Sequence, residues 1–284
     1  MTTPAMTTPY APAPGGLPPQ TALHTGRAVF TEAYAVIPHG VMSDIVTSAL
    51  PGWKHTRLWM LARPMSGFSE TFSHYLTEVG PDGGSDTPDP DPHAQSVIFV
   101  TEGTFWLSID GQESELTSGG YAYIPAGTQW HLHNGSDHPA RFHWIRKRYE
   151  PAPGLPAPKA FVTSDPETHP VPMPGTNDAW ATTRFVDPDD LSHDMHVNIV
   201  TLQPGATIPF EETHVMEHGL FVLTGKAVYR LNRDWVEVGP GDFLWLRAFC
   251  PQACYAGGPG PFRYLLYKDV NRHARLGGIL GPRA

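Results

Sequence analysis

Two histidines and two glutamates stand close together in the second half of the chain, in the sequence ETHVMEHG at residues 212–219. Side chains on a β-strand alternate between its two faces, so Glu212, His214 and His218 point the same way if this stretch is extended. Two imidazoles and one carboxylate on a common face form a donor set for a divalent metal ion of hard to borderline character. The competing interpretation is a polar strand whose side chains hydrogen-bond to one another and hold no metal.

Gln252 is a fourth candidate donor, because the strand pair that follows would bring it across to the same face. A carboxamide oxygen is a neutral hard ligand, and it favours Mn²⁺ or Fe²⁺ over a zinc site built from thiolates. Cys250 and Cys254 share the alternation of Gln252, which leaves a sulfur ligand open. The simpler interpretation is that both cysteines are small buried residues. Two cysteines are too few for a disulfide framework, so we expect a reducing compartment, the cytoplasm.

The elements that must position these donors are expected to be short strands. Gly and Pro contribute 28 and 31 of the 284 residues, too many for a helical bundle, and turn signals recur roughly every 8–12 residues, as in a β-sandwich or barrel. We therefore predict an all-β fold. The predicted strands include residues 96–100, 104–109, 121–124, 196–200, 219–223, 227–231 and 264–267.

The composition also restricts the partners of the protein. The formal net charge is −9 at pH 7 and no run of Lys and Arg is longer than Arg146–Arg148, which argues against binding to nucleic acid. No stretch approaches the ~18 consecutive apolar residues of a membrane span, so no membrane association is expected. A small molecule is therefore the expected partner.

Two parts of the chain repeat each other at a constant separation of 122 positions. The sequence FVTEG at 99–103 resembles FVLTG at 221–225, and Gly119 falls on Gly241. One constant shift that aligns strand centres and glycines is expected from two copies of a β-barrel unit. The expected division is a disordered Pro/Thr-rich tail at residues 1–21, a first barrel at 22–155 and a second barrel at 156–284, with a proline-rich connector around 151–174.

The candidate donors occur in only one of the two copies. The positions 122 residues before Glu212, His214, His218 and Gln252 hold Pro90, Pro92, Ser96 and Trp130. None of those four can bind a cation as the later residues do, so only the second barrel is expected to bind metal. The first copy also contains His131 and His133, but they lie one residue out of phase with Trp130. On a strand they would point away from the barrel interior.

The spacing around the donors resembles the motifs of the cupin family. Gly205 followed by Glu212-x-His214-x₃-His218-x₆-Gly225 is similar to the first cupin motif, with Glu in place of its first His and His in place of its Glu. Gly241 followed eleven residues later by Gln252 is similar to the second motif, with Gln at its His position. Arg247 and Phe249 stand where that motif has Pro and Gly, so the second match is weak by itself.

One branch of the cupins matches more of the chain. The sequences ETHVMEHG, LNRDWVEVGPGDFLWL and YLLYKDVNR, together with Gln252, resemble the (S)-ureidoglycine aminohydrolase family of allantoin and purine breakdown, from about Arg27 to Arg272. This resemblance implies two tandem jelly-roll cupin barrels, of which only the C-terminal one binds metal. It implies Mn²⁺, or another divalent ion, on Glu212, His214, His218 and Gln252, and substrate contacts from Tyr229, Tyr264, Lys268 and Glu212.

The activity implied by the resemblance is the Mn²⁺-dependent release of ammonia from (S)-ureidoglycine, a small ureide, to give (S)-ureidoglycolate. Glu212 would accept a proton from the attacking water, while Tyr264 and Lys268 would orient the substrate carboxylate and assist proton transfer. Two alternatives stay open: an iron cupin dioxygenase, which typically uses three His and one Glu, and a metal-containing binding cupin without turnover. Barrels of this kind expose sheet edges, so we also expect a homo-oligomer.

Overall fold

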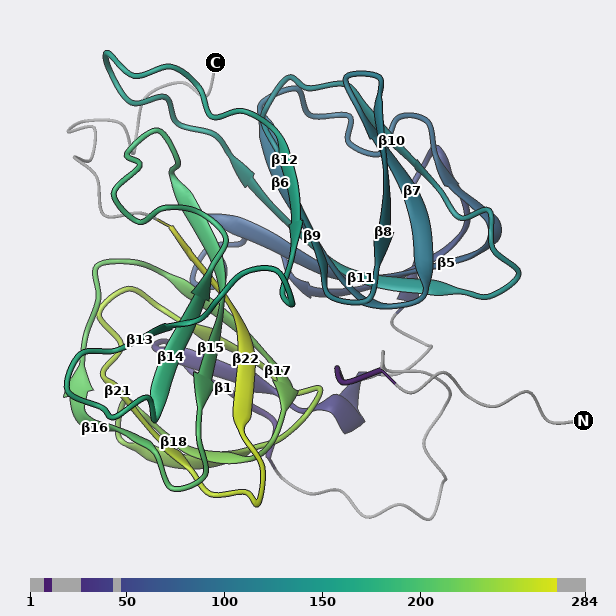
Figure 1. Ribbon diagram of the computed structural model, residues 1–284. Helices are drawn as coiled ribbons and strands as arrows, with labels where there is room; N and C mark the ends of the chain where they lie inside the picture. Colours follow the sequence, from purple (N-terminus) through teal and green to yellow (C-terminus); the bar gives the residue numbers. More distant parts are fainter. Residues whose placement is uncertain (1–7, 12–26, 43–46, 270–284) are drawn as a thin grey trace, which may run out of the picture.

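The computed structural model describes residues 8–11, 27–42 and 47–269, and its strands form two barrels that pack side by side (Figure 1). The first barrel is a ten-stranded sheet of β3 (Thr47–Ser48), β4 (Trp53–Ala62), β5 (Phe72–Ser85), β6 (Ala94–Glu102), β7 (Thr104–Ile109), β8 (Gln112–Thr117), β9 (Gly120–Ile124), β10 (Trp130–His133), β11 (Ala140–Arg148) and β12 (Phe161–Ser164). The all-β fold predicted from the sequence is confirmed.

The second barrel is built from two sheets. The larger has eight strands in the order β1 (Val29–Phe30), β2 (Tyr34–Ile37), β20 (Phe243–Leu246), β17 (His218–Thr224), β22 (Phe262–Asp269), β15 (Met195–Leu202), β14 (Trp180–Arg184) and β13 (Val171–Pro172). The smaller has the order β16 (Thr207–Glu212), β21 (Gln252–Ala256), β18 (Ala227–Leu231) and β19 (Asp234–Val238). A short 3₁₀ turn, η1, spans His39–Val41. No helix among the described residues is long and apolar enough to cross a membrane.

The strands in the middle of the larger sheets are buried on both faces. On β22, Tyr264 faces the interior of the second barrel, whereas the next residue, Leu265, belongs to an apolar cluster between the barrels. In the same cluster Phe72 of the first barrel stacks on Tyr267 of the second, with ring centroids 4.0 Å apart. Because successive side chains leave a strand on opposite faces, such strands need apolar residues at nearly every position. The runs at 97–100 and 220–223 meet this need.

The register of strand pairing repeats with the offset of 122 residues that the sequence predicts. Ser96 pairs with Arg146 in the first barrel, and His218 pairs with Lys268 in the second. The same shift carries the pair of Trp130 and Ile109 onto the pair of Gln252 and Leu231. The two barrels therefore place equivalent residues at equivalent points, and their side chains can be compared one to one.

The two barrels exchange strands across the division expected near residues 155 and 156. Tyr34–Ile37 pairs with β20 of the second barrel, far from its neighbours in sequence. In the other direction, Phe161–Ser164 pairs with β9 of the first barrel. Each exchanged strand covers the backbone N–H and C=O groups of a sheet edge that would otherwise stay unpaired. The connector therefore contains sheet structure in addition to its prolines.

Part of the N-terminal segment that the sequence predicts to be disordered is packed against the barrels. Tyr10 is buried, its ring meets Phe99 edge-on at 5.2 Å, and its hydroxyl donates a hydrogen bond to Asp165. The backbone N–H of Ala11 donates to Leu223 of the second barrel. An aromatic ring among the prolines explains the difference, because it supplies the apolar surface that the rest of the stretch lacks. Residues 1–7 and 12–21 of the predicted tail lie outside the described residues.

Buried polar groups also join the barrels. The Glu217 carboxylate accepts hydrogen bonds from the backbone N–H groups of Glu70 and Thr71, at 2.8 and 2.9 Å, and from the indole N–H of Trp245 at 2.6 Å. At another point of the interface between the barrels, His74 and His143 share a hydrogen bond of 2.9 Å between their ring nitrogens, and both are fully buried. Glu217 fixes the start of β17, and the next residue is His218.

Candidate functional site

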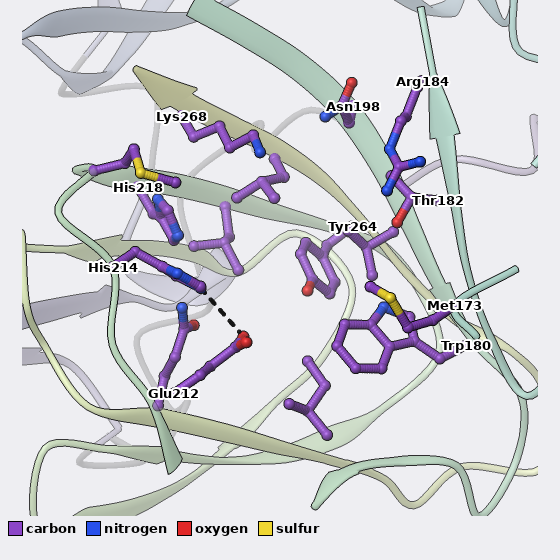
Figure 2. A pocket seen from close by; sticks show the side chains of 16 residues that line it. Met173, Trp180, Thr182, Arg184, Asn198, Glu212, His214, His218, Tyr264 and Lys268 are labelled. Carbon is purple, nitrogen blue, oxygen red and sulfur yellow. Dashed lines mark ion pairs between the residues drawn. The ribbon is translucent and has the colours of Figure 1, made fainter. Parts of the chain in front are cut away.

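A cavity of about 170 Å³ opens between the two sheets of the second barrel (Figure 2). It is lined by Met173, Trp180, Thr182, Arg184, Asn198, Val200, Ile208, Glu212, His214, Met216, His218, Leu220, Gln252, Tyr264, Leu266 and Lys268. The volume suits one small molecule. In Figure 2, Glu212, His214 and His218 lie on one side of the cavity, and Trp180, Thr182 and Arg184 lie on the other.

All four candidate metal donors line this cavity. Glu212 ends β16 and Gln252 begins β21, and the two residues are register partners in that strand pair, so their side chains leave the sheet on the same face. His218 begins β17, whereas His214 sits in the turn between β16 and β17. The strand predicted from the sequence therefore does not extend through residues 213–216. His214 nevertheless lines the same cavity, because the turn places it there.

The donors are neighbours, but they are not closed around one point. Nε2 of His214 lies 3.4 Å from Oε1 of Glu212, and the ring centroids of His214 and His218 are 5.1 Å apart. Among the described residues, no three His, Cys, Asp or Glu side chains converge tightly enough to hold a metal ion by themselves. The amide of Gln252 is buried beside them and adds a donor of another type.

The chemistry of this donor set fits a divalent cation. Burial lowers the pKa of His218 to about 4, so its imidazole is neutral at physiological pH and keeps a lone pair for a ligand. Its Nδ1 atom is buried and has no hydrogen-bond partner among residues 8–11, 27–42 and 47–269. A buried polar atom without a partner is costly unless a ligand satisfies it. Two imidazoles, a carboxylate and a neutral amide oxygen match the preferences of Mn²⁺ or Fe²⁺.

The two cysteines do not belong to this donor set. Cys250 and Cys254 are both buried, and neither lines the cavity. Burial raises the pKa of Cys250 to about 11 and that of Cys254 to about 12, so both thiols stay protonated at neutral pH. Since the thiolate is the form that binds metals, the sulfur ligand left open by the sequence is not favoured.

Lys268 and Tyr264 project into the cavity from β22, four residues apart, with Leu266 midway between them. Burial, and then the positive charge of Arg184, lower the pKa of Lys268. Burial raises the pKa of Tyr264, so its hydroxyl keeps its proton. The cavity therefore presents an ammonium group and a hydroxyl donor to whatever binds beside the metal donors, which suits an anionic ligand.

Tyr229 is the one predicted site residue that does not line the cavity. It is fully buried on β18, and its ring meets that of Tyr264 edge-on, with centroids 6.2 Å apart. Tyr229 therefore lies behind Tyr264, where it supports that ring.

The equivalent positions of the first barrel are occupied differently. The Ser96 hydroxyl accepts a hydrogen bond from the indole of Trp144 at 3.0 Å, and Trp130 packs edge-on against the same indole. Arg146, the counterpart of Lys268, forms an ion pair with Asp89, its Nε 2.6 Å from the carboxylate. Aromatic rings thus fill the space that is a cavity in the second barrel. His131 and His133 are exposed on β10, as the strand phase predicts.

The sequence motifs did not identify the residues on the opposite wall of the cavity. Trp180, Thr182 and Arg184 alternate along β14, and Asn198 and Val200 alternate along the neighbouring β15. Arg184 and Asn198 are register partners. Their alternation was the only signal in the sequence that could have found them.

Comparison with known proteins gives consistent matches along the chain. Residues 75–146 and 198–267 match the cupin domain family. The chain is 29% identical over 248 residues to (S)-ureidoglycine aminohydrolase from Escherichia coli K12, covering 85% of this chain and 93% of that protein. It is 32% identical over 250 residues to (S)-ureidoglycine aminohydrolase from Arabidopsis thaliana, covering 87% and 79%.

Solved structures agree with this pattern. A structure described as a putative glyoxylate induced protein from Pseudomonas aeruginosa superposes with a TM-score of 0.88 at 61% identity, over 94% of this chain and 98% of that one. Salicylate 1,2-dioxygenase from Pseudaminobacter salicylatoxidans superposes with a TM-score of 0.63 at 16% identity, over 88% of each chain. The second likeness concerns the fold alone.

Proposed function

The chain belongs to the cupin family and, within it, to the (S)-ureidoglycine aminohydrolases, and from this premise we propose that it hydrolyses (S)-ureidoglycine to (S)-ureidoglycolate and ammonia in purine breakdown. The observation that carries the proposal is one cavity in the second barrel, lined together by Glu212, His214, His218, Gln252, Tyr264 and Lys268. Its volume of about 170 Å³ suits a small ureide.

Mn²⁺ is part of this proposal, with Glu212, His214, His218 and Gln252 as its ligands in the second barrel alone. When bound, the ion would supply a fixed positive charge and a template for the substrate amine and carboxylate. Lys268 forms no ion pair within the described part of the chain, in contrast to its counterpart Arg146. An ammonium group without a protein carboxylate suits the carboxylate of the substrate.

The reaction needs one proton given and one proton taken. The bond between the substrate carbon and its amine breaks as the lone pair of the ureido nitrogen forms a C=N bond, and the amine leaves as ammonia after it gains a proton. The Lys268 ammonium and the Tyr264 hydroxyl are the donors in the cavity. Water then adds to the same carbon, and the Glu212 carboxylate takes its proton. One proton leaves the donor and one reaches Glu212, so the net charge of the protein is unchanged, and return of that proton from Glu212 to the donor restores both groups for the next turnover.

Two other activities remain as alternatives for the experiment. The likeness to a dioxygenase is at 16% identity and concerns the fold. Iron cupin dioxygenases typically use three histidines and a glutamate, whereas two histidines line this cavity. A binding protein without turnover would have no need of a proton acceptor and two proton donors around one ligand. Location in the cytoplasm and assembly into a homo-oligomer stay predictions.

The decisive experiment measures ammonia released from freshly prepared ureidoglycine by the purified protein, with and without Mn²⁺, while oxygen uptake is followed in parallel. We expect Mn²⁺-dependent ammonia release well above the spontaneous rate and no oxygen uptake. Oxygen uptake without ammonia would identify a dioxygenase. Tight metal binding with neither signal would identify a binding protein, and in both cases the proposed function would be wrong.

A further inference from the structure

The wall of the cavity opposite the metal donors carries a cation and an amide that no motif explains. Arg184 on β14 and Asn198 on β15 are register partners, so their side chains stand next to each other on the inner face of the sheet. Figure 2 shows both on the side of the cavity away from Glu212 and His214. The mechanism proposed above uses neither residue.

Arg184 is half-buried, and within the described ranges no carboxylate forms an ion pair with it. Its positive charge acts on another cation that lines the same cavity, Lys268, and lowers the pKa of that ammonium group. A guanidinium group carries five N–H donors in a planar fork, so it leaves several of them for a ligand in the cavity. Such a group is suited to a planar acceptor such as a carbonyl or a carboxylate.

Asn198 gives the second, independent observation. It is 4% exposed, it lines the cavity, and its Oδ1 atom is buried and accepts no hydrogen bond from the residues that the structure describes. A buried acceptor without a donor is destabilising, so the oxygen is suited to a ligand with an N–H or O–H group. A carboxylate has only acceptors and cannot meet that need.

We infer that Arg184 and Asn198 form the recognition site for the ureido arm of the substrate, an inference that rests on the proposed function. The ureido group is planar and offers both partners that this wall lacks. Its carbonyl oxygen accepts from the Arg184 guanidinium, and its terminal NH₂ group donates to Asn198 Oδ1. The carboxylate and the amine then lie toward Lys268 and the metal donors. This arrangement fixes which group leaves the carbon, because only the amine lies near the proton donors.

Two ligands that differ only at the terminal group test the role of Asn198. N-carbamoylglycine ends in NH₂ and N-acetylglycine ends in a methyl group of similar size. Their dissociation constants are measured by calorimetry on the Mn²⁺-loaded full-length protein, so no turnover is needed. The wild-type protein should prefer N-carbamoylglycine by roughly tenfold, the effect of one buried hydrogen bond. Asn198→Leu should abolish this preference, and Asn198→Asp, which keeps an acceptor, should retain it.

A third ligand separates the two possible roles of Arg184. Glycolate has the carboxylate but no ureido carbonyl. Arg184→Gln should raise the dissociation constants of N-carbamoylglycine and N-acetylglycine to a similar extent, by roughly tenfold. It should change the dissociation constant of glycolate less than twofold. Arg148→Gln, at an exposed position of the first barrel, is the matched control and should change none of the three. Equal weakening of all three ligands by Arg184→Gln would assign Arg184 to the carboxylate and overturn the inference.

Folding and function are tested separately in the same series. Circular dichroism and bound Mn²⁺ per chain must match the wild-type protein, and the Asn198→Asp variant, which conserves shape, covers a failure of Asn198→Leu to fold. If the wild-type protein releases ammonia but shows no preference for N-carbamoylglycine, the recognition site is wrong and the proposed function stands. If the preference is present without ammonia release, the recognition site stands and the proposed function is wrong.

Discussion

Lys268 lies directly opposite His218 across the paired strands β22 and β17, and both side chains line the same cavity. Antiparallel residues in register hold their Cβ atoms about 5 Å apart, so the ammonium group is held beside one of the candidate metal ligands. The equivalent pair in the first barrel is Arg146 and Ser96, where Asp89 neutralises the cation. In the second barrel the positive charge remains available to a ligand.

Replacing Lys268 by Met should remove the charge and the proton while keeping the length of the side chain. We expect kcat/KM for ureidoglycine to fall roughly a hundredfold or more, the usual contribution of a positioned proton donor, with bound Mn²⁺ unchanged. Ammonia release and elemental analysis measure the two effects. Lys226→Met, at an exposed lysine of the same barrel, is the control and should retain full activity. Wild-type activity in Lys268→Met would remove Lys268 from the reaction.

Removing a proposed ligand on either strand of the β16–β21 pair should weaken the binding of Mn²⁺. Glu212→Ala and Gln252→Ala should each lower the affinity for Mn²⁺ by at least about tenfold and lose activity in parallel. Equilibrium dialysis followed by elemental analysis measures the bound ion. Cys250→Ala is the control, because Cys250 is buried outside the cavity, and it should bind Mn²⁺ as the wild-type protein does. A Glu212→Ala protein that is active without metal would contradict the assignment.

The buried His74–His143 pair should make stability depend on pH. Burial lowers the pKa of His143 from its ordinary 6.5 to about 3 and holds that of His74 well below the ordinary value. Below pH 6.5 the unfolded chain therefore binds protons that the folded chain cannot, and stability falls as pH falls. His143→Gln should remove roughly 2 kcal/mol of the loss between about pH 6.5 and about pH 5. Urea unfolding at both values measures it, and an unchanged pH dependence would show that His143 titrates normally.

The Glu217 carboxylate should stabilise the interface between the two barrels strongly. Glu217→Ala leaves two backbone N–H groups and the indole N–H of Trp245 without their acceptor. We expect the free energy of unfolding to fall by about 3 kcal/mol, measured by urea unfolding. Glu115→Ala, at an exposed position of the first barrel, should change it by less than about 0.5 kcal/mol. Equal effects of the two substitutions would show that the network is not needed.

Strand alternation and the internal repeat predict the barrels, because both can be read from the order of residues without knowing which strands pair. Strand alternation places Trp130 inward and His131 outward on β10, and the constant offset aligns Ser96 with His218. The same rules bring Glu212 and Gln252 to one face, since the two strands pair in the register that the motif spacing implies. His214 lies in the cavity as predicted, but for a different reason: a turn, rather than strand alternation, brings it there.

Long-range choices could not be predicted in this way. The partner of Tyr34–Ile37 is a strand near the other end of the chain, and nothing in its four residues specifies β20. The packing of Tyr10 depends on a surface that exists only when Phe99 and Asp165 are in place. Arg184 and Asn198 look like ordinary strand residues until pairing sets them side by side.

The pairing of β2 with β20 has a consequence for synthesis on the ribosome. The first barrel can close as soon as its own strands and the following β12 have emerged. The strand Tyr34–Ile37 is made early but has no native partner until Phe243–Leu246 has been translated. The half that carries the cavity is therefore finished last, and a gene split between the halves would give neither product its full set of strands.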